Sequence, residues 1–315
     1  MRPLKIGIFL PGLFEVVGND GQVTAAIHWD ELRAFARRVE ALGFDSLWIP
    51  DHLLFRWEGE AGPTTGGWEG WSMLAALAAN TERIELGTLV VCTAFRNPAL
   101  LAKMADTVDE ISGGRLILGV GAGYHETEFS AFGYPYDHRA SRFEEALTII
   151  TTLLREGRID FTGSYYQARD CELRPRGPRP GGPPILVAGG MPAGPRMLSL
   201  GAERADLWND WLVWGRSRPD AVPPLRQRLD AACVDVGRDP ASLERTATIQ
   251  ISFLEDKPGA ASAEEQPLIG TPQALAEAFR GFAQEGIGHL QLALTPGTEA
   301  SLEALAPALE ELDRD

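Results

Sequence analysis

The chain has 315 residues, of which 44% are hydrophobic and 23% are charged, a balance typical of a globular protein. Its formal net charge of −15 argues against a nucleic-acid-binding protein, because such proteins carry a basic surface. Cys92, Cys171 and Cys233 form no metal-binding or disulfide pattern, so no metal site is expected and the cytoplasm is the expected location. No apolar run reaches the roughly 18 residues that a membrane-spanning helix needs.

Short apolar runs alternate with amphipathic patterns in the first half of the chain. One helix is especially well delimited, because Asn97 is expected to cap it, Pro98 fits its first turn and Gly113 ends it. Strands are expected at Lys5–Phe9, Asp45–Ile49, Ile84–Val91 and Leu116–Val120. The other helices are expected at Asp30–Leu42, Trp71–Ala79 and Ser141–Arg155.

The alternation stops at residues 158–184, which are rich in Pro, Gly and Arg and are interpreted as a surface insertion, with a hairpin expected. Beyond the insertion the alternation resumes. Strands are expected at Ile185–Ala188, Ala205–Trp208, Ala247–Phe253 and His289–Leu294. Helices are expected near Pro195–Leu200, at Pro223–Val236, after a cap at Thr271, and at Ser301–Leu312, where Pro307 is expected to kink or shorten the helix.

These elements predict an α/β fold. The eight expected strands are continuous apolar runs, which is typical of a parallel sheet covered by helices on its faces. Eight such units close a (β/α)8 TIM barrel, so residues 1–315 are predicted to form one barrel domain with an insertion at about 158–184. A doubly wound open sheet is the alternative.

Barrel active sites lie where the strands end, so the residues that follow each strand are the candidates. Asp51 and His52 follow the second strand and suit acid/base chemistry, with a local hydrogen bond in the loop as the alternative. After the third strand, Cys92 is expected to be a buried apolar filler rather than a reactive thiol. Arg96 is expected either to reach an anion or to be a solvated loop charge.

Two glycine-rich turns and several tryptophans also follow strands. Gly121, Gly123, Tyr124 and His125 follow the fourth strand, with a spacing that does not fit a dinucleotide-binding fingerprint but allows a ring or phosphate to approach the backbone. A second turn precedes a helix and has the composition of an anion site; it contains Ala188, Gly189, Gly190 and Arg196. An apolar substrate pocket is expected to be walled by Trp57, Trp68 and Trp208.

Several segments together make a specific resemblance. They include KIGIFLP, GFDSLWIPDHLLF, AANTERIELGTLVV, the long run NPALLAKMADTVDEISGGRLILGVGAGYHETEFSAFG, RFEEALTII, DFTGSYYQ, PPILVAGG and ADLWN. With these segments the chain resembles, over nearly its whole length, the luciferase-like flavin- and deazaflavin-dependent oxidoreductases, which are (β/α)8 barrels. The family includes bacterial luciferase and alkanesulfonate monooxygenase.

The resemblance implies a cofactor ring at the strand ends and a phosphate near Gly189 and Gly190. It also implies a non-prolyl cis peptide near Leu89–Val90, packed behind the ring, and a second contact of the cofactor with the turn from Gly121 to His125. Family members act on small organic molecules and are commonly dimers, so a homodimer is expected, with a flavin reductase as partner if the cofactor is FMN.

The resemblance favours coenzyme F-420 (8-hydroxy-5-deazaflavin) as the cofactor, and hydride transfer between it and a small organic substrate as the reaction. His52 is then the expected acid/base, oriented by Asp51. Tyr124 stands where some deazaflavin dehydrogenases carry a carboxylate, so sugar-phosphate chemistry is not expected. Two alternatives are an FMNH2-dependent two-component monooxygenase and a non-catalytic flavin-binding protein.

Overall fold

The structure is a computed structural model and describes residues 2–17, 22–56, 63–189, 193–213, 216–254 and 268–314. The chain forms two compact units, each built from segments distant in sequence. Unit 1 comprises Met1–Pro11, Ala34–Trp48 and Ala188–Asp315, and unit 2 comprises Gly12–Arg33 and Ile49–Val187. Two predicted site residues, Trp57 and Gly190, lie outside the described residues.

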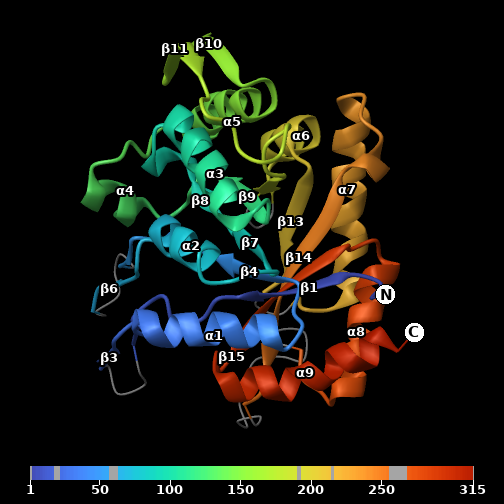
Figure 1. Ribbon diagram of the computed structural model, residues 1–315. Coiled ribbons are helices and arrows are strands. Elements are labelled where there is room, and N and C mark those ends of the chain that lie inside the picture. The colour runs from blue at the N-terminus through green and yellow to red at the C-terminus, as the bar shows by residue number, and fades with distance from the viewer. Residues whose placement is uncertain are drawn as a thin grey trace. The chain divides into compact units, whose positions relative to one another are not determined.

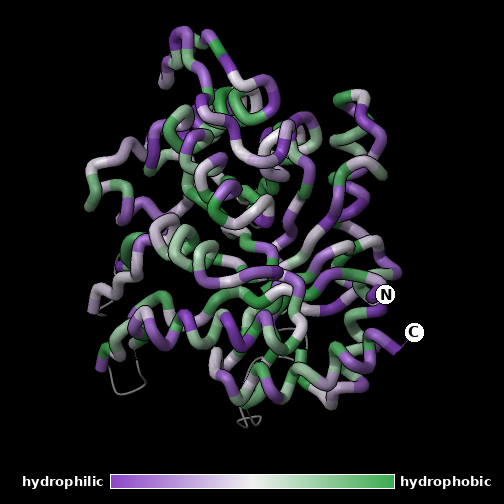
Figure 2. Tube along the Cα trace, viewed as in Figure 1, coloured by the Kyte–Doolittle hydropathy of each residue, from purple (hydrophilic) through white to green (hydrophobic). Residues whose placement is uncertain are grey.

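Unit 1 holds a parallel sheet with the strand order β13-β14-β15-β1-β4. The strands are continuous apolar runs: Ile6, Ile8 and Leu290 are fully buried. Figure 2 shows hydrophobic and hydrophilic residues alternating along α1 and α9, as expected for helices that bury one face. The strands are β1 (Lys5–Phe9), β4 (Ser46–Ile49), β13 (Leu207–Trp211), β14 (Glu244–Ser252) and β15 (His289–Thr295). The helices are α6 (Pro195–Arg204), α7 (Val222–Asp235), α8 (Pro272–Gln284) and α9 (Glu299–Asp313), with α1 (Trp29–Ala41) starting in unit 2.

Unit 2 has the same construction around β9, which pairs in parallel with three other strands. The four strands, β9 included, are β7 (Glu85–Thr88), β8 (Val91–Cys92), β9 (Leu116–Gly121) and β12 (Ile185–Ala188). The helices are α2 (Gly70–Ala78), α3 (Pro98–Ser112), α4 (Glu126–Phe132) and α5 (Arg139–Glu156). Two short antiparallel pairs join β2 (Val16–Val17) to β3 (Val23–Thr24) and β5 (Leu54–Phe55) to β6 (Thr65–Gly66).

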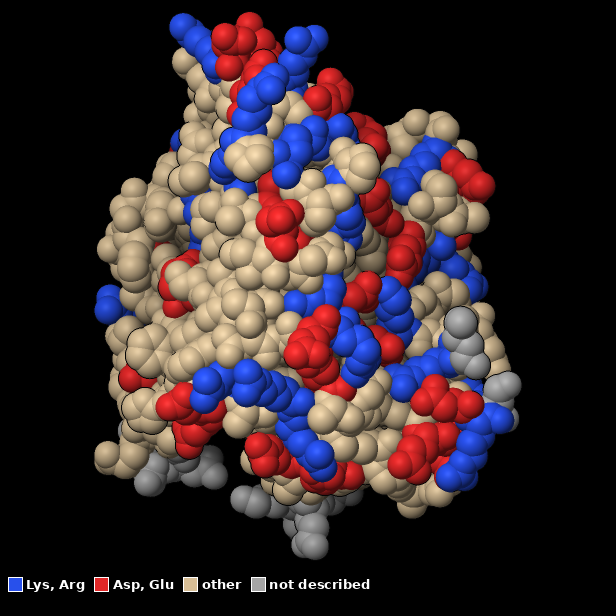
Figure 3. Space-filling model, viewed as in Figure 1, with Lys and Arg blue, Asp and Glu red and all other residues tan. Residues whose placement is uncertain are grey.

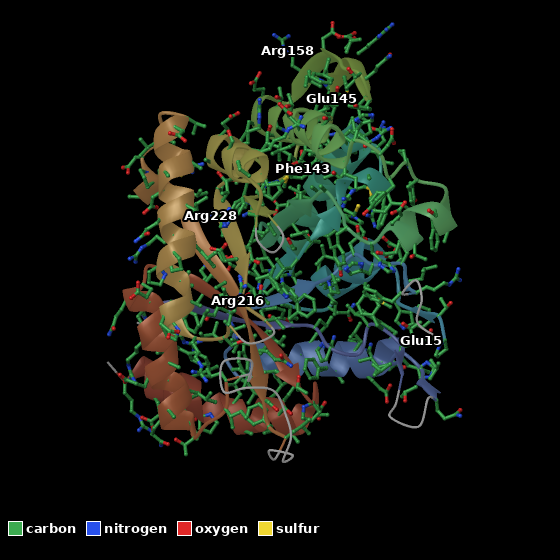
Figure 4. All side chains as sticks on the ribbon, turned by 180° about the vertical axis from the view of Figure 1, so that it is seen from behind. Glu15, Phe143, Glu145, Arg158, Arg216 and Arg228 are labelled. Carbon is green, nitrogen blue, oxygen red and sulfur yellow. The ribbon has the colours of Figure 1, made fainter. Side chains whose placement is uncertain are left out.

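The predicted insertion is a hairpin of β10 (Arg158–Thr162) and β11 (Gln167–Glu172). It extends from the end of α5 (Figure 1). Glu145 of α5 holds its turn, because this carboxylate accepts hydrogen bonds from the backbone N–H groups of Ser164, Tyr165 and Tyr166. Figure 4 labels Glu145 and Phe143 on α5 and Arg158 at the start of the hairpin.

The predicted limits of α3 are confirmed in detail. The Asn97 side chain accepts from the backbone N–H groups of Ala99 and Leu100, and Gly113 ends the helix in the left-handed conformation. Of the two effects expected of Pro307, a kink or a shorter helix, the shortening is not found, because α9 continues to Asp313. Its buried residues beyond the proline, Ala308, Leu309 and Leu312, keep this part of the helix packed.

Two further differences concern unit 2. The predicted third strand is divided into β7 and β8 by a cis peptide bond between Leu89 and Val90, at the place the resemblance implied. The predicted turn after β9 contains a helix, α4, that the sequence patterns did not reveal.

The fold class is the predicted (β/α)8 barrel, since eight parallel strands alternate with helices along the chain when β7 and β8 count as one. Acidic and basic side chains are intermixed on the face drawn in Figure 3. Among the helices of the described residues, none has the length and apolarity needed to cross a membrane.

Candidate active site

His52 lies just beyond the end of β4, and its imidazole is fixed by a carboxylate from a different element. Its Nδ1 atom lies 2.8 Å from Oε1 of Glu128, which is on α4. The Glu128 side chain is 2% exposed and that of His52 is 22% exposed. Because the carboxylate accepts a hydrogen bond from Nδ1–H, the other ring nitrogen, Nε2, is the atom that can exchange a proton.

Glu128 is buried, and both of its carboxylate oxygens accept hydrogen bonds. Its second oxygen, Oε2, accepts from the backbone N–H of Leu53 at 2.5 Å and from that of Leu54 at 3.4 Å. Glu128 also lies in the first turn of α4, where a negative charge is favoured by the helix dipole. The same carboxylate therefore holds both the imidazole of His52 and the backbone that follows it.

Asp51 has a different partner from the one expected. Its buried carboxylate accepts two hydrogen bonds from Arg96, at 2.6 and 2.9 Å, and one from the backbone N–H of Cys92 at 3.0 Å. The prediction that Asp51 orients His52 is corrected, because Glu128 occupies Nδ1 of that ring. Asp51 instead ties the end of β4 to β8 and so positions the backbone next to His52.

Arg96 is not the solvated loop charge that was one of the two expectations from the sequence. It is an ion-paired residue with 11% of its side chain exposed, bonded to Asp51 and also to Glu69. The two carboxylates raise the pKa of the guanidinium against the opposing effect of burial. Glu69 at the same time accepts from the N–H groups of Trp71 and Ser72 at the start of α2. Against the effect of burial, the hydrogen bonds from Ser72 and the charge of Arg96 lower the pKa of Glu69.

Tyr124 reaches His52 from the loop after β9. Its hydroxyl oxygen lies 3.5 Å from Nε2 of His52, and the two rings meet edge-on at 5.3 Å. The preceding residue, Gly123, has φ of +72°, and a Cβ atom there would approach Sγ of Cys92 to 2.6 Å. The glycine is therefore required by the turn and by close packing, whether or not a ligand approaches it.

His125 and Cys92 are buried beneath this loop. Nε2 of His125 accepts from the backbone N–H of Arg56 at 3.3 Å, and burial lowers the pKa of His125 although Glu128 opposes the shift. Burial raises the pKa of the Cys92 thiol to about 12. Cys92 packs with Phe95 and Phe129, which agrees with the predicted role as an apolar filler.

Aromatic side chains surround the imidazole of His52. The ring of Phe55 lies 4.6 Å from it and that of Phe14 lies 6.2 Å from it, measured between centroids. Glu15, labelled in Figure 4, accepts from the backbone N–H of Gly66 in β6. Trp68 is 46% exposed and donates its indole N–H to the carbonyl of Ile27.

The predicted anion site in unit 1 begins at the end of β12. Gly189 faces the indole of Trp208, since a Cβ at residue 189 would lie 2.5 Å from that ring. Trp208 is 1% exposed and donates to Asp210, so it is a core residue of unit 1 rather than a wall of an open pocket. Helix α6 begins at Pro195 without a side-chain cap, and exposed Arg196 lies in its first turn.

Sequence reasoning missed Glu128 and Glu69. Both are single acidic residues in loop-like or helix-start segments, and neither stands at the end of an apolar strand. The one available signal is that Glu128 precedes Phe129 and follows His125 by three residues, the spacing of one helical turn. Glu126, in the same turn of α4, is exposed.

The chain is similar in sequence to known oxidoreductases. The chain is 32% identical over 276 residues to an F-420-dependent glucose-6-phosphate dehydrogenase of Kineococcus radiotolerans, covering 84% of this chain and 75% of the relative. It is 30% identical over 269 residues to the pyrimidine monooxygenase RutA of Agrobacterium fabrum, covering 80% of this chain and 69% of the relative.

Solved structures support the fold. A structure of an F-420-dependent secondary alcohol dehydrogenase with an F-420–acetone adduct superimposes with a TM-score of 0.76 at 19% identity, covering 100% of both chains. The family model for luciferase-like monooxygenases matches residues 4–308. The chain therefore belongs to the luciferase-like monooxygenase family of α/β-barrel oxidoreductases.

Proposed function

We propose that the protein transfers hydride between coenzyme F-420 and a small organic substrate, with His52 as the acid/base and Glu128 as the residue that orients it. The observation that carries the proposal is the 2.8 Å contact between Nδ1 of His52 and the buried carboxylate of Glu128. Such a pair fixes the tautomer of the imidazole and supports the charge it gains on protonation. The F-420 dependence named for the Kineococcus relative favours this cofactor.

The donor chemistry of unit 2 fits a redox cofactor that needs a proton-transfer partner. When bound, a deazaflavin supplies or takes a hydride, and the protein must supply or take the matching proton. Nε2 of His52 is suited to this, since Nδ1 is held by Glu128 and the ring is only partly exposed among aromatic side chains. Leu89, Val90, Gly121, Gly123, Tyr124 and His125 are the residues of unit 2 proposed to contact the cofactor.

The phosphate of the cofactor is proposed to bind at Ala188–Gly189 and the start of α6 in unit 1. The first N–H groups of this helix lack a side-chain cap, and Arg196 adds positive charge in the first turn. Gly189 gives weaker support than the sequence suggested, because packing of Trp208 already explains why this residue has no side chain.

Titration of the protein with F-420 and with FMN, followed by fluorescence, tests the choice of cofactor. We expect F-420 to bind more tightly. A protein that binds FMN and does not bind F-420 would contradict the proposal. With a competent substrate, His52→Ala is then expected to lower kcat by about 100-fold or more, in the range of a lost general acid/base.

The second candidate is a monooxygenase that uses reduced FMN delivered by a flavin reductase. The 30% identity to pyrimidine monooxygenase RutA favours it. If the protein consumes oxygen with reduced FMN and consumes no oxygen with reduced F-420, the monooxygenase function is correct. A protein that binds flavin without turnover would show neither activity. The homodimer remains a prediction.

A further inference from the structure

Tyr124 and His52 present two polar atoms to the same point of unit 2. The phenol oxygen is 3.5 Å from Nε2 of His52, at the long limit of a hydrogen bond. Glu128 holds Nδ1 on the opposite edge of the imidazole. Nε2 of His52 and the phenol oxygen of Tyr124 therefore lie next to each other, at the edge of the imidazole that Glu128 does not contact.

The position of Tyr124 is set by its backbone even though the residue is 56% exposed. The carbonyl of Tyr124 accepts from the hydroxyl of Tyr136 at 3.0 Å, and the carbonyl of Gly123 accepts from Arg139 at 2.7 Å. The next residue, His125, is held by the N–H of Arg56. Three consecutive residues are thus tied to separate elements, which directs the phenol toward His52.

Two donors at this separation suit one shared acceptor. Consider an oxygen atom at about 2.8 Å from each of two donors that are 3.5 Å apart. The angle between the two donors at that oxygen is about 77°, which the two lone pairs of one oxygen can serve. Burial and the Glu128 carboxylate raise the pKa of the Tyr124 phenol, so this group keeps its proton and donates. A protonated His52 donates from Nε2 in the same way.

We propose that Tyr124 and His52 together bind one oxygen atom of the substrate, and that the substrate is an alcohol or the corresponding carbonyl compound. The inference rests on the proposed function. In the direction of reduction, the carbonyl carbon receives a hydride, which is two electrons and one proton, from reduced F-420. The oxygen receives the proton from Nε2 of His52, so that C=O becomes CH–OH, and solvent reprotonates His52. Oxidation of the alcohol follows the reverse path.

The surroundings indicate that the rest of the substrate is apolar and uncharged. Phe14 and Phe55 flank the imidazole of His52. The buried charge next to it is the carboxylate of Glu128, which repels an anion. Arg96 already pairs with two carboxylates. A sugar phosphate, the substrate class named for the Kineococcus relative, would meet unfavourable charge here.

Binding of isobutyramide, an inert carbonyl compound, tests the inference without turnover. Calorimetry is done on the F-420-loaded protein and compares the wild type with Tyr124→Phe and with the control Tyr134→Phe, whose ring packs on Phe95. We expect Tyr124→Phe to weaken binding about tenfold, the effect of one hydrogen bond, and Tyr134→Phe to leave it unchanged. Equal affinity of wild type and Tyr124→Phe, or no binding to either, overturns the inference.

Turnover of 2-propanol separates this inference from the proposed function. We expect Tyr124→Phe to lower kcat/KM by about 10- to 100-fold, since it removes one donor to the reacting oxygen. Loss of activity in His52→Ala with none in Tyr124→Phe overturns the shared-oxygen role alone. Failure of F-420 to bind, or full activity of His52→Ala, overturns the proposed function instead.

Discussion

The candidate site of unit 2 and the interior of unit 1 bury polar groups in opposite ways. At the candidate site of unit 2 two buried carboxylates are each hydrogen-bonded: Asp51 to Arg96 and a backbone N–H, and Glu128 to His52 and backbone N–H groups. In unit 1 the buried groups are neutral. Nε2 of His289 contacts Ser46 at 2.7 Å, while Nδ1 of His289 has no hydrogen-bonding partner within the described part of the chain.

This difference indicates which unit is expected to carry acid/base chemistry. Burying a charge is costly unless it is paired, so a cluster of paired buried charges needs a reason beyond packing. A neutral polar network in a core, such as Asn209 with Gln291 and Thr246, is stable without a functional role. This contrast supports placing acid/base chemistry in unit 2, and each of the following experiments tests one side of it.

Removing the buried cation is expected to have the largest effect. Arg96→Ala leaves the Asp51 carboxylate buried without its charge partner and is expected to lower the free energy of unfolding by about 3–5 kcal/mol. Urea denaturation measures the change. The exposed pair of Arg33 and Asp30 supplies the control, with Arg33→Ala expected to cost less than about 1 kcal/mol. Similar values for the two variants would show that Asp51 is effectively solvated.

Glu128→Gln is expected to lower kcat/KM by about 100-fold, the upper range for a group that orients another. The amide has one acceptor oxygen, so it cannot accept from both His52 and the N–H of Leu53 as the carboxylate does. The control is Glu126→Gln in the same helical turn, where the side chain is exposed. A pH–rate profile taken with each variant separates loss of orientation from loss of folded protein; unchanged kcat/KM in Glu128→Gln rules out the orienting role.

In unit 1, Gly189→Ala is expected to lower the free energy of unfolding by about 1–3 kcal/mol, because the new methyl group overpacks against Trp208 and Ala193. Gly194→Ala, where a Cβ meets nothing within 4 Å, is the matched control and is expected to cost under about 1 kcal/mol. Thermal unfolding measures both. A Gly189→Ala protein of normal stability and reduced F-420 affinity would show that the ligand, rather than Trp208, requires the glycine.

The buried imidazole of unit 1 predicts a pH dependence. Burial lowers the pKa of His289 to about 3, below its value in the unfolded chain, with Lys5 adding to the shift. The unfolded state therefore takes up a proton that the folded state does not, and stability falls as pH drops below about 6.5 toward 3. Relative to His289→Gln, the wild type is expected to lose about 1.4 kcal/mol between pH 7.5 and 5.5. Urea denaturation measures the free energy of unfolding of both proteins. The same difference between wild type and His289→Gln at pH 7.5 and pH 5.5 would contradict this.

Local patterns in the sequence predicted most of the fold. The eight barrel strands, the capped helix α3 and the β10–β11 hairpin were all expected from apolar runs, caps and composition. These features depend on residues a few positions apart, which is why they can be read directly from the chain. The helix that escaped prediction, α4, is only seven residues long and follows a glycine turn, so its pattern is too short to recognise.

The sequence by itself therefore determined the barrel class and the family, and it predicted His52 as the candidate acid/base. Only the tertiary structure decided which carboxylate serves this histidine. Asp51 adjoins His52 in the chain but binds Arg96, while Glu128, 76 residues away, reaches Nδ1. The physical reason is that successive residues leaving a strand point in different directions, and hydrogen-bond partners are chosen by distance in space.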